Sequence, residues 1–309
     1  MNKPFQIYRS TNKQHLSDCP TKPSLRGEAG MKGLLLRILG YPRPARVALV
    51  RKIIQRFSLF SYRDRLAFCA VERPHYGHCI FEAAKLAVRL GYPKISVIEF
   101  GCGGGNGLLN AEMHISEIEK IFPVKIELYG FDTGVGLPCA QDYRDFAHYF
   151  KPGLYHMDSA ILKSRLTRAK LILGDVKDTC KTFFTKYDPA PIGCVFHDLD
   201  FYSSTKEALR LFEGDASYFL PRIFLYFDDI IGTNTWLISE FAGELLAIEE
   251  FNMKHSFKKI AANRYMPLMY PDQWWAHEIY IYHDFHHPKY NTFVGDDEQI
   301  GHEVDIKLQ

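Results

Sequence analysis

Four aspartates in two short segments are the side chains of this 309-residue chain best suited to bind a cation or move a proton. Asp198 and Asp200 follow one apolar run, and Asp228 and Asp229 follow the next. Clustered carboxylates repel one another unless a cation or a shared proton neutralises them. Oxygen ligands favour a hard cation, so we expect Mg²⁺. The alternative is that the carboxylates are solvated separately or pair with lysines and arginines.

The positions of these aspartates indicate how they could converge. Residues two apart in a strand point to the same side, so we expect Asp198 and Asp200 to close a strand and face one cleft together. Asp228 and Asp229 are adjacent, and both can serve one site only if their strand has ended before them. The carboxyl ends of neighbouring parallel strands would then carry the site.

A second segment, VIEFGCGGGNG from Val97 to Gly107, joins an apolar strand to a helix through a turn that is rich in glycine. A turn with so few side chains lets a cofactor approach the backbone closely. The G-x-G-x-x-G spacing of dinucleotide sites is missing, since it reaches Asn106 or Leu108 instead of glycine. The acid Glu99 before the turn also suits a ligand with an ammonium group better than a pyrophosphate.

The pattern E-x-G-x-G-x-G, formed by Glu99, Gly101, Gly103 and Gly105, resembles the first motif of class I S-adenosylmethionine-dependent methyltransferases. The resemblance implies that the glycines flank the methionine part of the cofactor and that the acid orients the site. The alternative is a tight turn before a capped helix, with no ligand.

Two further acids stand where such a cofactor needs them. Asp132 ends the expected second strand, where a carboxylate can accept hydrogen bonds from ribose hydroxyls. Asp175 follows the third, where it can accept one from the adenine amino group. An acid at a strand end is also a common turn or helix N-cap residue, and this alternative stays open for both.

Apolar strands alternate with helical stretches beyond Arg63, which is typical of a parallel sheet covered on both faces. The expected strands are 95–100, 125–131, 169–173, 194–199, 223–227, 257–262 and 278–283. The expected helices are 80–90, 107–121, 159–168, 178–187, 204–213 and about 235–252. We therefore predict an α/β, doubly wound, seven-stranded sheet of the methyltransferase (Rossmann-like) type with an N-terminal helical extension.

Three regions are predicted: an N-terminal extension over residues 1–66, a methyltransferase domain over 67–292 and a C-terminal tail over 293–309. Within the extension, 1–30 is expected to be loosely ordered. The stretch 29–63 contains no Asp or Glu and mixes basic with apolar residues, which predicts two short basic helices broken at 41–44. They either pack on the domain or contact a membrane surface or an acidic partner.

Three segments together resemble the macrocin O-methyltransferase family, the metal-dependent sugar O-methyltransferases of antibiotic biosynthesis. They are GFDTGVGLP (130–138), DLDFYSSTKEAL (198–209) and FDDIIG (227–232), and the similarity covers about residues 95–235. The resemblance implies that Asp198, Asp228 and Asp229 bind Mg²⁺ against substrate hydroxyls and that Asp200 is the base. Residues 266–288 have no counterpart that we can place.

Composition narrows the class of protein. A net charge of +2 gives no field that would attract nucleic acid, and no stretch is apolar enough to predict a membrane span. Seven cysteines without a C-x-x-C spacing favour a reduced, cytoplasmic compartment.

We expect an O-methyltransferase for a sugar or other small-molecule acceptor. The alternatives are a metal-independent N- or C-methyltransferase and a non-catalytic nucleotide-binding or scaffold protein. Whether copies assemble into a homo-oligomer stays open.

Overall fold

The computed structural model describes residues 45–56 and 60–295. Contacts divide the chain into two compact units, Met1–Leu59 and Phe60–Gln309. In the first unit the described element is the helix α2, Ala45–Arg56, which covers the second of the two predicted basic helices. The other basic helix, the stretch 1–30 and most of the expected tail lie outside the described residues, and the three predicted regions stay predictions.

The second unit contains a seven-stranded sheet with the order β3-β2-β1-β4-β5-β7-β6. The first five strands are parallel, and β7 runs antiparallel to both β5 and β6. The strands are β1 (Lys94–Phe100), β2 (Lys125–Asp132), β3 (Lys170–Leu173), β4 (Ile192–His197), β5 (Phe219–Phe227), β6 (Lys258–Ala262) and β7 (Ile279–Asp284). This confirms the predicted doubly wound, methyltransferase-type sheet with its closing antiparallel pair.

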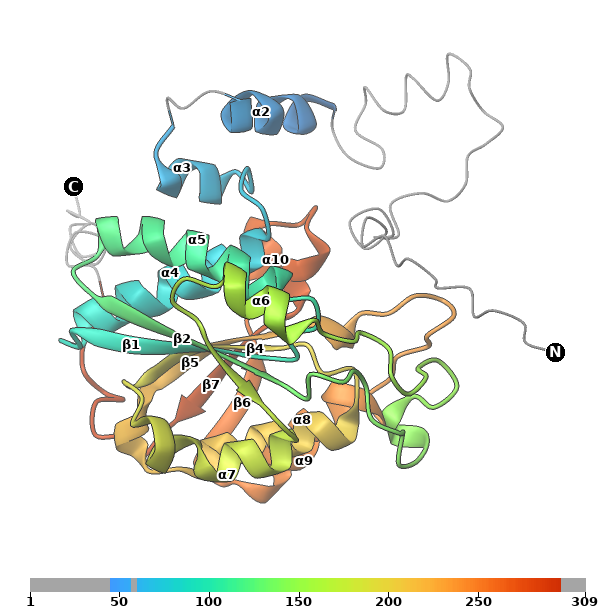
Figure 1. The fold of residues 1–309 in the computed structure, drawn as a ribbon. Coiled ribbons are helices and arrows are strands. Elements are labelled where there is room, and N and C mark those ends of the chain that lie inside the picture. Colours follow the sequence, from blue (N-terminus) through green and yellow to red (C-terminus); the bar gives the residue numbers. More distant parts are fainter. Residues whose placement is uncertain (1–44, 57–59, 296–309) are drawn as a thin grey trace, which may run out of the picture. The chain divides into compact units, whose positions relative to one another are not determined.

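Helices cover both faces of the sheet (Figure 1). One face carries α4 (Pro74–Arg89) and α5 (Asn106–Ile121), and the other carries α7 (Val176–Tyr187), α8 (Tyr202–Leu209) and α9 (Gly243–Lys254). The remaining helices are α3 (Tyr62–Ala67), α6 (Ser159–Arg165) and α10 (Met266–Met269), with 3-10 turns at Tyr143–Asp145, Arg210–Glu213, Ala216–Tyr218, Asp228–Ile230 and Trp274–His277. Because both faces are covered, the central strand β4 is buried along its whole length.

Several element ends differ from the prediction for local reasons. Helix α4 begins six residues early, at Pro74, because proline is well suited to the first turn of a helix. Helix α9 begins at Gly243 instead of about residue 235, so the chain between β5 and α9 is a longer loop. Strand β4 ends at His197, before the aspartates that were expected to close it. This last difference changes how the acidic site is built.

None of the helices within 45–56 and 60–295 combines the length and the apolar character needed to cross a bilayer.

The start of β3 is fixed by a buried acid on the neighbouring helix α5. Glu112 accepts hydrogen bonds from the backbone N–H groups of Thr167, Arg168 and Ala169, and from the Thr167 hydroxyl at 2.6 Å. Burial opposes the charge of Glu112, but these hydrogen bonds outweigh it and lower its pKa. The carboxylate therefore satisfies several donors of the connection that leads into an edge strand of the sheet.

We predict that Glu112→Ala lowers the free energy of unfolding by about 1 to 3 kcal/mol, because it leaves three backbone N–H groups without their acceptor. Urea unfolding followed by circular dichroism measures the change. Glu117→Ala is the matched control on the same helix, since Glu117 makes an exposed pair with Lys120 at 2.7 Å and should cost about 0.5 kcal/mol or less. Equal losses for the two variants would contradict this account of Glu112.

Candidate active site

The glycine turn after β1 passes directly beside the end of β4. The N–H of Asp198 donates to the carbonyl oxygen of Phe100 at 2.9 Å. A Cβ atom on Gly101 would lie 1.7 Å from the Asp198 carbonyl oxygen, and Gly101 has a φ of +81°. Only glycine fits such an approach. The turn and the acidic segment therefore meet between β1 and β4, the switch point where ligands bind in open α/β sheets.

The other glycines of the turn differ in what surrounds them. A Cβ on Gly105 would lie 2.1 Å from Leu162 Cδ1, whereas at Gly103 the nearest atom of the described residues is Tyr155 Cβ, at 3.9 Å. Both glycines have positive φ angles, +79° and +46°. Packing thus accounts for Gly101 and Gly105, and Gly103 is the glycine that leaves room for a ligand beside the turn.

Glu99 is buried beneath the turn with one oxygen satisfied and one free. The hydroxyl of Tyr76 donates to Glu99 Oε1 at 2.7 Å, while Oε2 has no hydrogen-bond partner within the described chain. Gly107 permits this placement, because a Cβ there would lie 1.8 Å from Oε1. Burial raises the pKa of Glu99 to about 7, against the opposing effects of Tyr76 and Arg73. An unpaired buried oxygen of this kind fits a donor group such as an ammonium.

The two acids expected to hold the nucleoside part are placed differently. Asp132 lies beside the turn and accepts the N–H groups of Gly103 and Gly134 at 2.9 and 2.6 Å. Each of its carboxylate oxygens retains a lone pair for a ligand hydroxyl. Asp175 is exposed and caps helix α7 by accepting the N–H of Lys177 at 2.8 Å. Its capping role is the alternative that the sequence had left open.

Asp198, Asp228 and Asp229 converge as a potential ligand set. One carboxylate oxygen from each lies within 4.8 Å of the others, and in the described residues this is the group of acids, histidines or cysteines with metal-binding geometry. Strand β5 ends at Phe227, and the 3-10 turn Asp228–Ile230 lets both adjacent aspartates serve one site. The oxygens are close enough for one hard cation to bridge after small side-chain adjustments.

The expectation that strand alternation brings Asp200 to the side of Asp198 is wrong. Strand β4 has already ended, and Asp200 has a φ of +59°. A different contact holds it at the site, because its N–H donates to Asp229 Oδ2 at 2.7 Å. Asp200 is buried, and this backbone contact holds it next to the three converging acids.

Sequence reasoning missed two buried acids behind this set. Glu244 Oε2, at the start of α9, accepts the Asp229 N–H at 3.1 Å. The Tyr226 hydroxyl lies 2.7 Å from both Asp228 Oδ1 and Glu278 Oε2. One hydroxyl proton cannot satisfy two ionised carboxylates, so this group requires a further proton or a cation. The only sequence signal was an acid inside an otherwise apolar run, as in GELLAIEEF.

Electrostatics make the cluster costly in its fully ionised form. Burial is the largest cause that raises the pKa values of Asp198, Asp229, Glu244 and Glu278, and the charges of neighbouring carboxylates raise them further. Burial and the charge of Asp228 raise the pKa of Asp200 to about 7. A bound cation would relieve the repulsion and the unfavourable burial together.

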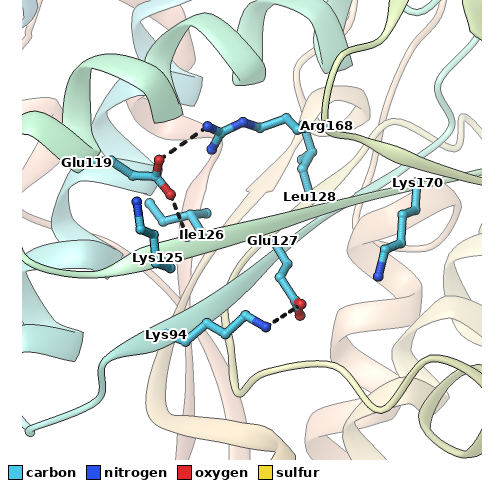
Figure 2. Close-up of a pocket in the computed structure, with 8 residues that line it drawn as sticks. All are labelled: Lys94, Glu119, Lys125, Ile126, Glu127, Leu128, Arg168 and Lys170. Atoms are coloured by element: carbon cyan, nitrogen blue, oxygen red, sulfur yellow. Dashed lines mark hydrogen bonds and ion pairs between the residues drawn. The ribbon is translucent and has the colours of Figure 1, made fainter.

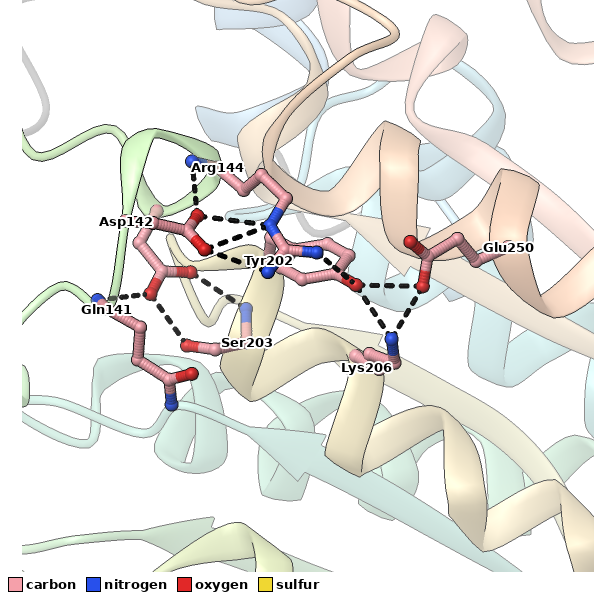
Figure 3. Close-up of polar contacts among 8 residues, drawn as sticks. Gln141, Asp142, Arg144, Tyr202, Ser203, Lys206 and Glu250 are labelled. Carbon is pink, nitrogen blue, oxygen red and sulfur yellow. Dashed lines mark hydrogen bonds and ion pairs between the residues drawn. The ribbon is translucent and has the colours of Figure 1, made fainter.

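The loop after β2 is fixed to α8 and α9 by polar contacts (Figure 3). Asp145 accepts both the N–H and the hydroxyl of Ser203, at 2.8 and 2.9 Å, and so caps α8 from a distant part of the chain. The Tyr202 hydroxyl accepts a hydrogen bond from the guanidinium of Arg144, in the same loop, and donates one to the carboxylate of Glu250 in α9.

A small apolar core also anchors this loop. Phe146 and Phe150 pack with Phe201 and Ala242, and Trp236 stacks on Tyr149 with ring centroids 5.2 Å apart. Tyr155, from the same loop, stands beside Gly103. Burial is the largest cause that raises the pKa of Tyr155, and the charges of Asp200, Asp229 and Asp198 raise it further. Tyr155 is therefore close to the glycine turn and within electrostatic range of the acids.

A surface hollow lies at the amino ends of β1, β2 and β3, opposite the carboxyl ends of the strands where the acids lie (Figure 2). Its charged side chains are largely paired with one another, as in Lys94 with Glu127 at 2.6 Å and Arg168 with Glu119 at 3.2 Å. Lys170 lies over the Tyr129 ring. These pairs satisfy the edge of the sheet, and the hollow contains none of the predicted site residues.

The sheet order and the helices on both faces give the chain a doubly wound fold of the methyltransferase (Rossmann-like) type. No protein-family model matches it, and no curated protein matches it. It is similar to the solved structure of the calicheamicin methyltransferase CalS11 (19% identity, 69% of this chain and 86% of that chain, TM-score 0.42). It is also similar to the O-methyltransferase NovP (13% identity, 67% of this chain and 78% of that chain, TM-score 0.45). A third similar structure is the O-methyltransferase TomG from Streptomyces achromogenes (14% identity, 69% of this chain and 79% of that chain, TM-score 0.35).

We predict that Mg²⁺ stabilises the protein more at about pH 8 than at about pH 5, as thermal melting with excess Mg²⁺ or a chelator would measure. An acid whose pKa is raised on folding contributes most to the stability of the fold at low pH, where it is protonated. This contribution is lost as the pH rises from the pKa of the acid in the unfolded chain, about 4, through its higher pKa in the folded protein. The metal-free cluster is therefore least stable at high pH, where its ionised oxygens bind a cation best.

Asp198→Asn should flatten this part of the pH dependence and remove most of the Mg²⁺ effect. A Mg²⁺ effect of the same size at both pH values, or one that persists in Asp198→Asn, would contradict the assignment of the cluster as a cation site.

Proposed function

We propose that this protein is an S-adenosylmethionine-dependent O-methyltransferase that acts, with Mg²⁺, on a hydroxyl of a sugar or other small-molecule acceptor. The observation that carries the proposal is the convergence of Asp198, Asp228 and Asp229 beside the turn at Gly101 and Gly103. Transfer to nitrogen or carbon without a metal, and a scaffold role, both leave this costly cluster unexplained.

The residues around the turn fit the donor. Glu99 offers its free buried oxygen to an ammonium group, Gly103 leaves room at the backbone, and Asp132 has lone pairs for ribose hydroxyls. Asp175 is assigned to the adenine amino group in addition to its capping contact. The donor supplies a methyl group that is already activated on a sulfonium. What the protein must add is a positioned, deprotonated oxygen.

The acidic residues fit the acceptor side. Asp198, Asp228 and Asp229 would hold the cation, which when bound lowers the pKa of a hydroxyl and fixes its position. Asp200 is the base that takes the hydroxyl proton, because it is adjacent to the cluster and its pKa lies near neutrality. Tyr226 and Glu244 orient the ligands by hydrogen bonds to Asp228 and Asp229.

The donor assignment predicts that S-adenosylmethionine and S-adenosylhomocysteine bind and that NAD⁺ binds much more weakly, because the turn offers an acid and no dinucleotide fingerprint. Isothermal titration measures the three affinities. Glu99→Gln should weaken both sulfur ligands while keeping the contact with Tyr76. Binding of NAD⁺ that equals or exceeds that of S-adenosylhomocysteine would show the donor assignment to be wrong.

The acceptor assignment predicts different effects at two neighbouring acids. Asp228→Asn should weaken Mg²⁺ binding and acceptor binding together, because it removes a ligand. Asp200→Asn should leave Mg²⁺ and donor binding nearly intact and reduce turnover by about 10² to 10⁴, the range for loss of a general base. Turnover assays on candidate sugars, with titration of Mg²⁺, measure both. Loss of Mg²⁺ binding in Asp200→Asn would make Asp200 a ligand instead of the base.

A further inference from the structure

Arg73 is a strained residue at the start of helix α4. It occupies the N-cap position with φ 42° and ψ 63°, a left-handed conformation that is unfavourable for a residue other than glycine. Its side chain makes no capping hydrogen bond. Strain of this kind persists where the surrounding structure imposes it, often at a ligand site.

The guanidinium of Arg73 is half-buried and has no hydrogen bond or ion pair within 4.0 Å to any residue that the structure describes. The guanidinium lies over the Tyr76 ring, with its Cζ atom 5.4 Å from the ring centroid. Burial lowers the pKa of Arg73, but the groups around it, Tyr76, Glu99, Asp198 and Asp228, outweigh this and raise it above its ordinary value. Arg73 thus stays charged and lies within electrostatic range of Glu99, Asp198 and Asp228.

Arg73 and Glu99 together offer the two opposite charges that an amino-acid zwitterion needs. Arg73 and Glu99 influence each other electrostatically without forming an ion pair, and both lie around Tyr76, which contacts each of them. Glu99 Oε2 is buried and lacks a partner in the described part of the chain. The N-terminus of the 16-residue helix α4 adds partial positive charge on the side of Arg73.

We propose that Arg73 binds the α-carboxylate of the donor's methionine part while Glu99 Oε2 accepts the α-ammonium, so that the two side chains recognise the amino-acid zwitterion from its two ends. The inference rests on the proposed function, because it names how that donor is held. It also explains why Arg73 is not paired with the acids that it faces: the ligand carboxylate takes the place of a protein partner.

The test compares ligands that differ only in the amino-acid part. In isothermal titration, Arg73→Met should weaken S-adenosylhomocysteine binding by about 10- to 100-fold, the range for a charged hydrogen bond. Methylthioadenosine, which lacks the amino-acid part, should bind wild type and Arg73→Met equally. Arg168→Met is the matched control, since Arg168 pairs with Glu119 at the far edge of the sheet (Figure 2), and it should bind both ligands as wild type does.

The outcomes separate the inference from the proposed function. If the wild-type protein fails to bind S-adenosylhomocysteine, the proposed function is wrong. If wild type binds it but Arg73→Met loses nothing, or loses the same factor for methylthioadenosine, the role of Arg73 is wrong and the donor assignment survives. A second measurement needs no variant: wild type should bind decarboxylated S-adenosylmethionine about 10- to 100-fold more weakly than S-adenosylmethionine. Equal affinities would also overturn the inference.

Discussion

Repulsion among closely spaced carboxylates at the ends of β4 and β5 is the constraint on which the site depends. Asp198 and Asp228 are half-buried and Asp229 is buried, and the buried acids Glu244 and Glu278 join them through hydrogen bonds with Asp229 and Tyr226. Each carboxylate moved out of water costs free energy unless it is hydrogen-bonded or neutralised. Hydrogen bonds from backbone N–H groups and from the Tyr226 hydroxyl offset part of this free energy. A divalent cation is suited to offset the remainder.

The rest of the fold keeps this arrangement from relaxing. Helices on both faces bury the strands, so the strand ends cannot separate, and the loop after β2 is fixed by Asp145 to the first turn of α8. In the described chain seven residues other than glycine have positive φ angles, and three of them, Arg73, Tyr155 and Asp200, belong to the surroundings of the turn and the acids. Residues keep such conformations where the surrounding structure imposes them, which is common at ligand sites.

Much of the architecture was predictable from the sequence. Alternating apolar strands and helical stretches have strong local patterns, and they predicted the strands, their approximate bounds and the doubly wound sheet. The residue types at the strand ends indicated the acid cluster, because the carboxyl ends of parallel strands meet at one edge. Element ends were less predictable where a proline started α4 or where β4 stopped before Asp198.

By itself, then, the sequence determined the sheet, the turn and the convergence of Asp198 with Asp228 and Asp229, because these follow from periodicity and strand direction. Only the tertiary structure decided which glycines serve packing, how Asp200 is held, and that Glu278 and Arg73 face the site. The physical reason is that such contacts join residues far apart in the chain. Their geometry depends on packing between elements, and no local pattern records it.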